Sequence, residues 1–201
     1  MPHFHFVEIG TSDSNTFIQK VRNTTTRGLS VEPLQEYLDR LPSPPGITKI
    51  CAAVGDSPGE LPIYYIPDEV RLAHGLPTWM KGTNSIGAPH PTVVRYLTRK
   101  GLSLSLIQQK TVPVIPLVDL LTQYAVESLD YLKIDTEGYD VRILQPFVAW
   151  LESGGGVKPK TIRYETNGLC NRDEAQALNN RLRALGYNIR QTQSDTYATL
   201  A

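Results

Sequence analysis

The chain has 201 residues, of which 40% are apolar, a length and composition that suit one compact domain with a sizeable core. Its 20 basic and 20 acidic side chains give a net charge of zero. A neutral chain has no overall field with which to hold a nucleic acid or an anionic membrane, so the expected partner is small or neutral and no membrane partner is expected.

The cysteine content and the N-terminal sequence predict a soluble, cytoplasmic protein. Cys51 and Cys170 lie far apart in different local contexts, which favours free thiols in a reducing compartment over a disulfide scaffold. No apolar run approaches the length of a membrane span. Residues 1–4 lead directly into a predicted strand and do not resemble a basic, apolar signal peptide.

The first predicted strand, residues 4–9, ends in a glycine turn. Gly10 lets the backbone bend close to a ligand. Ser12, Asp13 and Ser14 are good N-caps for a following helix that carries Phe17, Ile18 and Val21. The N-terminus of such a helix offers free N–H groups to a carboxylate or phosphate. Two glycines of the dinucleotide fingerprint are replaced here, so an ordinary strand-to-helix turn is the alternative interpretation.

The second predicted strand, residues 28–31, ends at Glu32, and a helix is predicted over residues 35–41. Glu32 follows the glycine turn by roughly the twenty residues expected of a unit that binds a ribose through a carboxylate. The alternative is a carboxylate that caps the helix or faces solvent.

The third predicted strand covers residues 47–54 and ends in small residues that suit an adenine ring, although a buried parallel strand has the same composition. An extra strand at the margin of the sheet is predicted for residues 60–66. Residues 67–91 have no regular pattern, and a loop of this length is usually functional. We therefore expect one domain over residues 1–201, with an irregular lid or substrate-binding insertion at about 58–112.

Residues 131–140 form the most informative stretch of the chain. An apolar run breaks at Asp135 and Glu137, and Gly138 allows a sharp turn before the helical spacing of Val141 and Leu144. The carboxylates thus follow the C-terminal end of a strand, where open α/β sheets bind ligands. A surface turn with the same residues is the alternative. The other predicted elements are strands 104–108, 112–115, 161–164, 187–191 and 195–200 and helices 116–124 and 173–185.

Five segments occur in the order and spacing of the FkbM-type methyltransferase family: residues 6–13, 31–33, 52–55, 118–119 and 132–138. The chain resembles this family over nearly its whole length, most specifically in Leu132 to Gly138. The resemblance implies an α/β class I methyltransferase fold, a Rossmann-like three-layer sandwich. Its sheet would be mostly parallel, with helices on both faces and a terminal antiparallel strand pair. It also implies S-adenosylmethionine as cofactor and methylation of a hydroxyl on a small molecule or a carbohydrate.

The resemblance also implies roles for the residues at the strand ends. The turn would approach the methionine carboxylate of the cofactor, and Glu8 its ammonium. Glu32 would bind the ribose, and Ala53 and Val54 would lie against the adenine. The residues of the turn are Gly10, Thr11, Ser12 and Asp13. A Rossmann-like domain that binds another nucleotide is the alternative.

The catalytic candidates are Asp135, Glu137 and His90. Asp135 would hold the amine of the cofactor or orient the acceptor, while Glu137 and His90 are candidates for the base. His90 titrates in the useful range, but a rigid loop residue between two prolines is the alternative. Lys133 lies on the same side of its strand as Asp135 and would keep that carboxylate ionised, or its side chain would extend past a helix.

Three questions stay open at the level of sequence. Oxygen ligands from Asp135, Glu165 and Asn167 would suit Mg²⁺, although such residues also gather at strand ends without an ion. An RNA ribose methyltransferase is a second enzyme hypothesis. The neutral charge and the lack of an aromatic and basic strip argue against it, and a basic face in the folded chain would revive it. A cofactor-binding module without catalysis is the third possibility.

Overall fold

The structure is a computed structural model that describes residues 2–13 and 16–201. The chain divides into two compact units. Met1–Gly59 and Val114–Ala201 form the first unit, and Glu60–Pro113 form the second.

The first unit is built on a seven-stranded sheet in the order β10-β11-β9-β8-β1-β2-β3. The strands are parallel except for β11, which runs antiparallel to both of its neighbours. This arrangement confirms the predicted α/β class and its terminal antiparallel pair. The strands are β1 His3–Ile9, β2 Gly28–Val31, β3 Ile47–Ile50, β8 Ser128–Ile134, β9 Thr161–Glu165, β10 Tyr187–Gln191 and β11 Asp195–Leu200.

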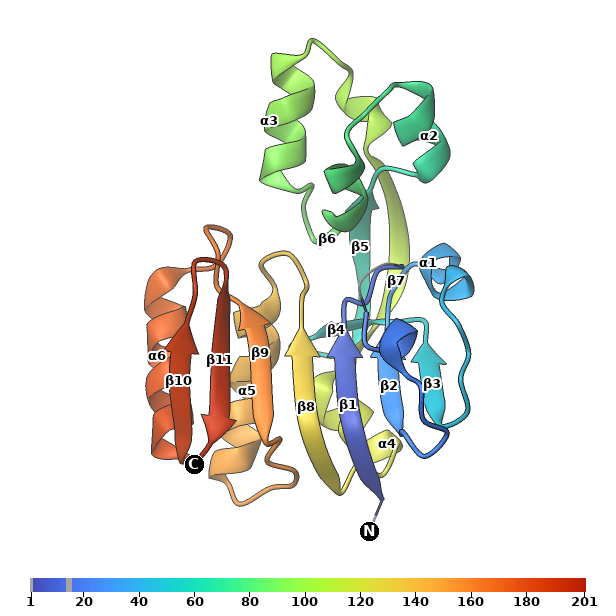
Figure 1. Cartoon of the computed structure of the whole chain (residues 1–201). Coiled ribbons are helices and arrows are strands. Elements are labelled where there is room, and N and C mark those ends of the chain that lie inside the picture. Colours follow the sequence, from blue (N-terminus) through green and yellow to red (C-terminus); the bar gives the residue numbers. More distant parts are fainter. Residues whose placement is uncertain (1, 14–15) are drawn as a thin grey trace. The chain divides into compact units, whose positions relative to one another are not determined.

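Three helices, α4 Leu117–Gln123, α5 Asp140–Glu152 and α6 Arg172–Ala184, lie together on one face of this sheet (Figure 1). Strand β9 beneath them alternates as a strand covered on one face should: Ile162 and Tyr164 are fully buried, and Arg163 between them is only half-buried. Burying each large apolar side chain contributes roughly 1.5–3 kcal/mol, so this layer holds the strand ends in place.

The opposite face near β1 is covered by the segment that joins β1 to β2. The ring of Phe17 packs against Phe6 of β1 at 5.4 Å and against Tyr131 of β8 at 5.1 Å. The prediction of a helix after β1 is wrong. Between β1 and β2, the described residues contain only the 3₁₀ turn η1, Ile18–Lys20. Residues 22–26 are arginine, asparagine and threonines, most of them weak helix formers, so the turn does not extend. Ser14, a predicted cap, lies outside the described residues.

The predicted strand 47–54 is two strands. After β3 the chain leaves the seven-stranded sheet, and β4 Ala53–Gly55 pairs in parallel with the end of β7, where Val54 faces Ile115. The helix predicted at residues 35–41 is present as α1 Gln35–Arg40.

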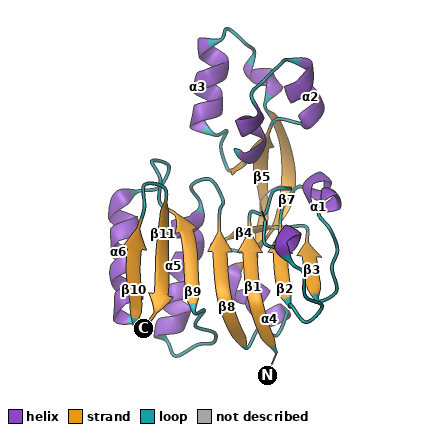
Figure 2. Ribbon diagram, viewed as in Figure 1, coloured by secondary structure: helices purple, strands orange, loops and turns teal. Residues whose placement is uncertain are grey.

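The second unit contains strands and short helices (Figure 2). It also has its own small core of buried side chains. Strand β5 Gly59–Tyr65 lies between β7 Gln108–Pro116 and β6 Ser85–Ile86, with which it is antiparallel. The other elements are the helices α2 Asp68–Ala73 and α3 Pro91–Arg99 and the 3₁₀ turns η2 Thr78–Gly82 and η3 Leu104–Leu106. The core consists of Ile66, Leu76, Met80, Val93 and Leu97.

Three predictions for this unit are wrong. Residues 67–91 are not irregular, because they contain α2, η2 and β6. The strand predicted at 60–66 pairs with β6 and β7, not with the margin of the seven-stranded sheet. Residues 104–106 form a 3₁₀ turn, because the hydroxyl of Ser103 accepts the Ser105 N–H and starts a helical turn there. Among the described residues, no helix has the length and apolar composition needed to cross a membrane.

Candidate active site

The carboxyl ends of β1 and β8 come together through the glycine turn predicted from the sequence. Gly10 has a φ of +74°, and a Cβ at this position would lie 1.9 Å from the carbonyl oxygen of Asp135. The Asp135 N–H donates to the carbonyl of Ile9 at 3.1 Å, which fixes the two strand ends to each other. Only glycine permits this close approach to Asp135, and the predicted approach of the turn to a ligand stays a prediction.

Lys133 joins two carboxylates at this edge of the sheet. Its Nζ lies 3.0 Å from Glu8 Oε1 and 3.2 Å from Asp135 Oδ2. The three side chains project from the same face of the paired strands, because Glu8 faces Lys133 in register. Burial disfavours the ammonium, but Glu8 and Asp135 outweigh it and raise the pKa of Lys133. The ammonium of Lys133 thus ends between the two carboxylates and not past a helix.

Glu8 is 1% exposed and is fully engaged. Its second oxygen accepts the N–H of Phe17 at 2.7 Å. Burial raises the pKa of Glu8, while Lys133 and the Phe17 amide act against that rise. Glu8 therefore anchors the turn after β1 to β8 through Lys133.

Glu32 occupies a similar place after β2. It is 4% exposed, and its two oxygens accept the N–H groups of Ser12 at 2.8 Å and Leu34 at 3.1 Å. Burial raises the pKa of Glu32 to about 7, and these two hydrogen bonds act against the rise. The carboxylate links the two strand-end turns, so the alternative of a solvent-facing side chain is wrong.

Two other residues of the first turn are enclosed. Asp13 forms an ion pair with Arg40 of α1 at 2.9 Å. Thr11 is 2% exposed, and its Oγ1 has no hydrogen-bond partner among the described residues. A buried hydroxyl without a partner is costly, and a polar group of a ligand at this turn would satisfy it.

The loop after β8 is held by Asp140, which the sequence interpretation did not assign to the site. Its fully buried carboxylate accepts the N–H and the hydroxyl of Thr136, at 3.2 and 2.6 Å, and the N–H of Glu165 at 3.0 Å. Burial raises the pKa of Asp140 to about 6 despite these bonds. The loop is therefore fixed to the end of β9.

Within this loop Glu137 adopts a φ of +53°, a conformation that is unusual for a residue with a side chain. Such strain collects at functional sites. The carboxylates of Asp135, Glu137 and Glu165 can all lie within 4.8 Å of one another. Burial, followed by the charges of Glu137, Asp140 and Asp135, raises the pKa of Glu165 to about 8. Glu165 is therefore protonated at neutral pH, which lowers the repulsion among the three groups.

Ala53 and Val54, the predicted adenine contacts, are each 1% exposed within β4, and their contact with the cofactor stays a prediction. The polar groups at the end of β4 are Asp56, Arg142 and Tyr139: the Arg142 guanidinium lies 2.9 Å from Asp56 and 4.5 Å from the Tyr139 ring. The sequence analysis missed these residues, although Asp56 follows a strand end just as Glu32 does.

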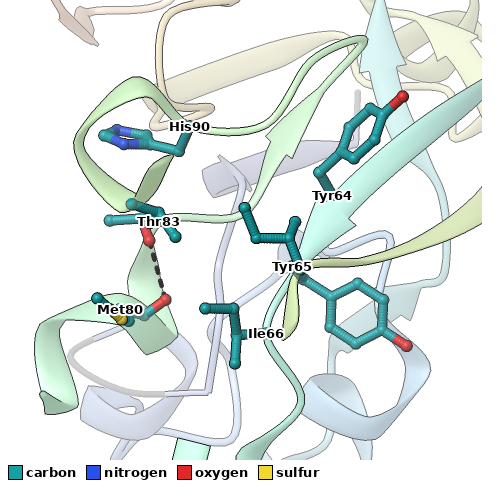
Figure 3. Close-up of a pocket in the computed structure, with 8 residues that line it drawn as sticks. Tyr64, Tyr65, Ile66, Met80, Thr83 and His90 are labelled. Atoms are coloured by element: carbon teal, nitrogen blue, oxygen red, sulfur yellow. Dashed lines mark hydrogen bonds between the residues drawn. The ribbon is translucent and has the colours of Figure 1, made fainter. Parts of the chain in front are cut away.

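His90 belongs to the second unit, where it caps α3 by accepting the Thr92 N–H at 3.2 Å. It is 7% exposed and lines a cavity of about 10 Å³ with Tyr64 and Met80 (Figure 3). That volume suits one water and no substrate. Asn167, a predicted metal ligand, accepts the Leu169 N–H at 2.8 Å and so caps a turn.

Comparison with known families agrees with this geometry. Residues 5–189 match the family model described as the Methyltransferase FkbM domain. No curated protein and no solved structure matches the chain. The match includes the turn after β1, Glu32 and the loop after β8. The chain belongs to the FkbM methyltransferase family.

Proposed function

We propose that the chain is an S-adenosylmethionine-dependent O-methyltransferase that acts on a hydroxyl group of a small molecule or a glycan. One observation carries the proposal. Lys133 holds Asp135 at the carboxyl end of β8, beside the Gly10 turn and next to a strained acidic loop. Membership of a methyltransferase family supports the reaction class.

The residues around the Gly10 turn fit the cofactor. A positive φ and the absence of a Cβ open the backbone here, and the buried Thr11 hydroxyl has no hydrogen-bond partner in the described part of the chain. Glu8 places negative charge beside the turn, as a cofactor ammonium requires. Glu32 uses one lone pair of each oxygen on backbone amides, so its remaining lone pairs are the ones left for ribose hydroxyls. When bound, S-adenosylmethionine supplies an electrophilic methyl group on a sulfonium.

Asp135 is the residue we assign to the acceptor hydroxyl. Its side chain is 37% exposed, so it is accessible to a substrate, and Lys133 fixes its orientation. Glu137 is the second candidate for the base. We do not assign Glu165 to this role, because burial raises its pKa to about 8 and so favours its protonated form near neutral pH. Alignment of the acceptor contributes most of the acceleration, and a base adds about 10² to 10⁴.

The experiment is a transfer assay with labelled S-adenosylmethionine across a panel of sugars and hydroxylated small molecules, using the native chain, Asp135→Asn and His90→Gln. Asp135→Asn should lower turnover by about 10² to 10⁴ and retain cofactor binding. Lower turnover in His90→Gln at unchanged cofactor binding would support the predicted role of His90 as a base, and unchanged turnover would remove it. Cofactor binding by the native chain without transfer to any acceptor would favour a non-catalytic binding module.

Magnesium stays a prediction. Carboxylates of Asp135, Glu137 and Glu165 are ligands that magnesium accepts, but carboxylates also gather at strand ends without an ion. We therefore propose no catalytic step that depends on a metal ion. Turnover that is lost to a chelator and regained with magnesium would support the metal, and turnover that is insensitive to a chelator would remove it.

We also propose a cytoplasmic location. Cys51 is exposed and Cys170 is half-buried, and neither forms a disulfide among the described residues. An exposed thiol is compatible with a reducing compartment. Exposed thiols that stay reduced in protein isolated from its source would support this location.

A further inference from the structure

The net charge of zero is the sum of the net charges of the two units, which are opposite in sign. The second unit contains six basic and three acidic residues, for a net charge of +3. The remainder contains 14 basic and 17 acidic residues, for a net charge of −3. The expectation that no membrane or nucleic acid would be bound rested on the total, which conceals the basic unit.

The exposed large apolar side chains follow the same division. Among the described residues these are Leu72, Trp79 and Leu104, which are 68%, 42% and 48% exposed, and all three belong to the second unit. Single exposed apolar residues are common. Their restriction to the smaller and basic unit is the feature that needs an explanation.

Contacts connect these side chains with the basic residues of α3. The ring of Trp79 packs edge-on against Tyr96 at 5.8 Å. The guanidinium of Arg99 and the ammonium of Lys100 both lie about 6 Å from the same Tyr96 ring, at 6.0 and 5.9 Å. Leu104 follows Lys100 after one short loop, in a turn that packs against α3. The helix of Leu72, α2, packs against η2, which carries Trp79.

The basic residues of α3 and its C-cap differ from Arg71 and Lys81, which both pair with Asp68. Arg95, Arg99 and Lys100 are exposed, and in the part of the chain that the structure describes no carboxylate lies within ion-pair distance of them. Within this unit, α2 and α3 lie at the end away from β5 and β6 (Figure 1). We call the set Leu72, Trp79, Arg95, Arg99, Lys100 and Leu104 the basic apolar surface.

We propose that the basic apolar surface binds an anionic lipid bilayer. Basic side chains are attracted to anionic headgroups, leucines enter the boundary of the acyl chains, and tryptophan prefers the interface between the two. The surface offers all three groups on one small unit. The binding is peripheral and reversible, and it is independent of the proposed methyl transfer.

The composition of the surface favours lipid over nucleic acid. Nucleobases stack on aromatic rings, and Leu72 and Leu104 have none. The Tyr96 ring is already covered by two basic side chains and by Trp79. A bilayer, in contrast, gains from leucine and tryptophan as well as from charge. Binding of RNA at this surface is therefore one of the results that the test distinguishes.

The test is flotation of the full chain with vesicles of phosphatidylcholine alone and of phosphatidylcholine mixed with phosphatidylserine. Partition onto the anionic vesicles should exceed that onto the neutral ones by about tenfold and should fall as salt is added. The emission of Trp79 should shift to the blue on binding. The shift should be absent in Trp79→Phe, in which Trp150 of the first unit is retained.

Two double variants separate charge from apolar contact. Arg99→Glu with Lys100→Glu should lower the partition by about tenfold or more. Arg172→Glu with Arg183→Glu makes the same charge change at exposed positions of α6 and should leave the partition within about twofold of the native value. Leu72→Gln with Leu104→Gln should lower it by about fivefold at unchanged charge.

Several results would overturn the proposal. The first is the absence of binding to anionic vesicles. Equal losses in the α3 and α6 variants would show attraction by total charge with no defined surface. Unchanged binding by the leucine variant would remove apolar insertion. If an RNA oligonucleotide displaces the protein from vesicles and needs Arg99 and Lys100, the surface is a nucleic-acid site and the lipid proposal is wrong.

Discussion

The two units of this chain use charged residues in opposite ways. In the first unit, carboxylates and a lysine are withdrawn from water and fixed by ion pairs and backbone amides at the ends of β1, β2 and β8. In the second unit, basic side chains stand on the surface beside exposed leucines and a tryptophan. Buried charges specify the geometry of a site, whereas exposed ones attract a partner.

The comparison shows why a whole-chain property is a poor guide to partners. A net charge of zero describes neither unit, because one carries −3 and the other +3. The same division predicts where substitutions will be costly. Changes of charge at the buried strand ends of the first unit should damage stability, and changes of charge on the basic apolar surface of the second should not.

The largest expected effect follows removal of the central ammonium. Lys133→Met leaves Glu8 and Asp135 without their shared partner, and a broken buried pair costs about 3–5 kcal/mol. Lys81→Met is the matched change in the second unit, where the ion pair to Asp68 is longer, at 3.7 Å, and should cost less than about 1 kcal/mol. Urea denaturation measures both. Similar losses of unfolding free energy in the two variants would contradict the contrast.

A smaller effect is expected at the glycine turn. Gly10→Ala places a Cβ 1.9 Å from the Asp135 carbonyl at a positive φ, which should cost about 2–4 kcal/mol. Gly82→Ala, in the second unit, meets no atom within 4 Å and should change stability by less than about 0.5 kcal/mol. Thermal unfolding compares them. If Gly10→Ala is as stable as the native chain, the turn can move away from the Asp135 carbonyl.

The dependence of stability on pH should also reside in the first unit. The folded-state pKa values of Glu165, Glu32 and Asp140 are raised by burial, to about 8, 7 and 6. The native state therefore holds more protons than the unfolded state, and the free energy of unfolding should fall as pH rises from about 5 to about 8. In Glu165→Gln the fall should be shallower at the upper end of this range, as denaturation at several pH values would show. If the unfolding free energy of Glu165→Gln falls with pH as steeply as that of the native chain, groups other than Glu165 cause the pH dependence.

The smallest effect on folding is expected at the basic apolar surface. Leu72→Gln and Leu104→Gln replace exposed side chains, so each should change the free energy of unfolding by less than about 0.5 kcal/mol. Chemical denaturation checks this value. A larger loss would mean that these leucines serve the core of the second unit.

Much of the first unit was predictable because local patterns and packing agree there. The alternation in residues 161–164 and the apolar spacing of α5 gave the strands and helices to within a few residues. The absence of a helix after β1 could not be predicted, because the residues at its expected start are good helix caps. Only the weak helix formers that follow disfavour a helix there. Carboxylates that bind backbone amides, such as Asp140, were also missed, since sequence does not show what a buried acid accepts.

The second unit was the least predictable part. Its elements are short, and its core of five side chains leaves little periodicity to detect. His90 was assigned as a candidate base from its titration range alone, whereas the structure uses it to cap α3. Its role in catalysis stays a prediction that His90→Gln tests.

The most direct measurement is calorimetric titration of S-adenosylhomocysteine into the native chain, Thr11→Val and Thr11→Ser. The Thr11 hydroxyl is buried and, within residues 2–13 and 16–201, has no hydrogen-bond partner, so valine should leave the fold intact or more stable. The account predicts that the native chain and Thr11→Ser bind the ligand and that Thr11→Val binds about tenfold more weakly. No binding by a folded native chain, or equal binding by all three, would contradict the assignment of the cofactor to the Gly10 turn.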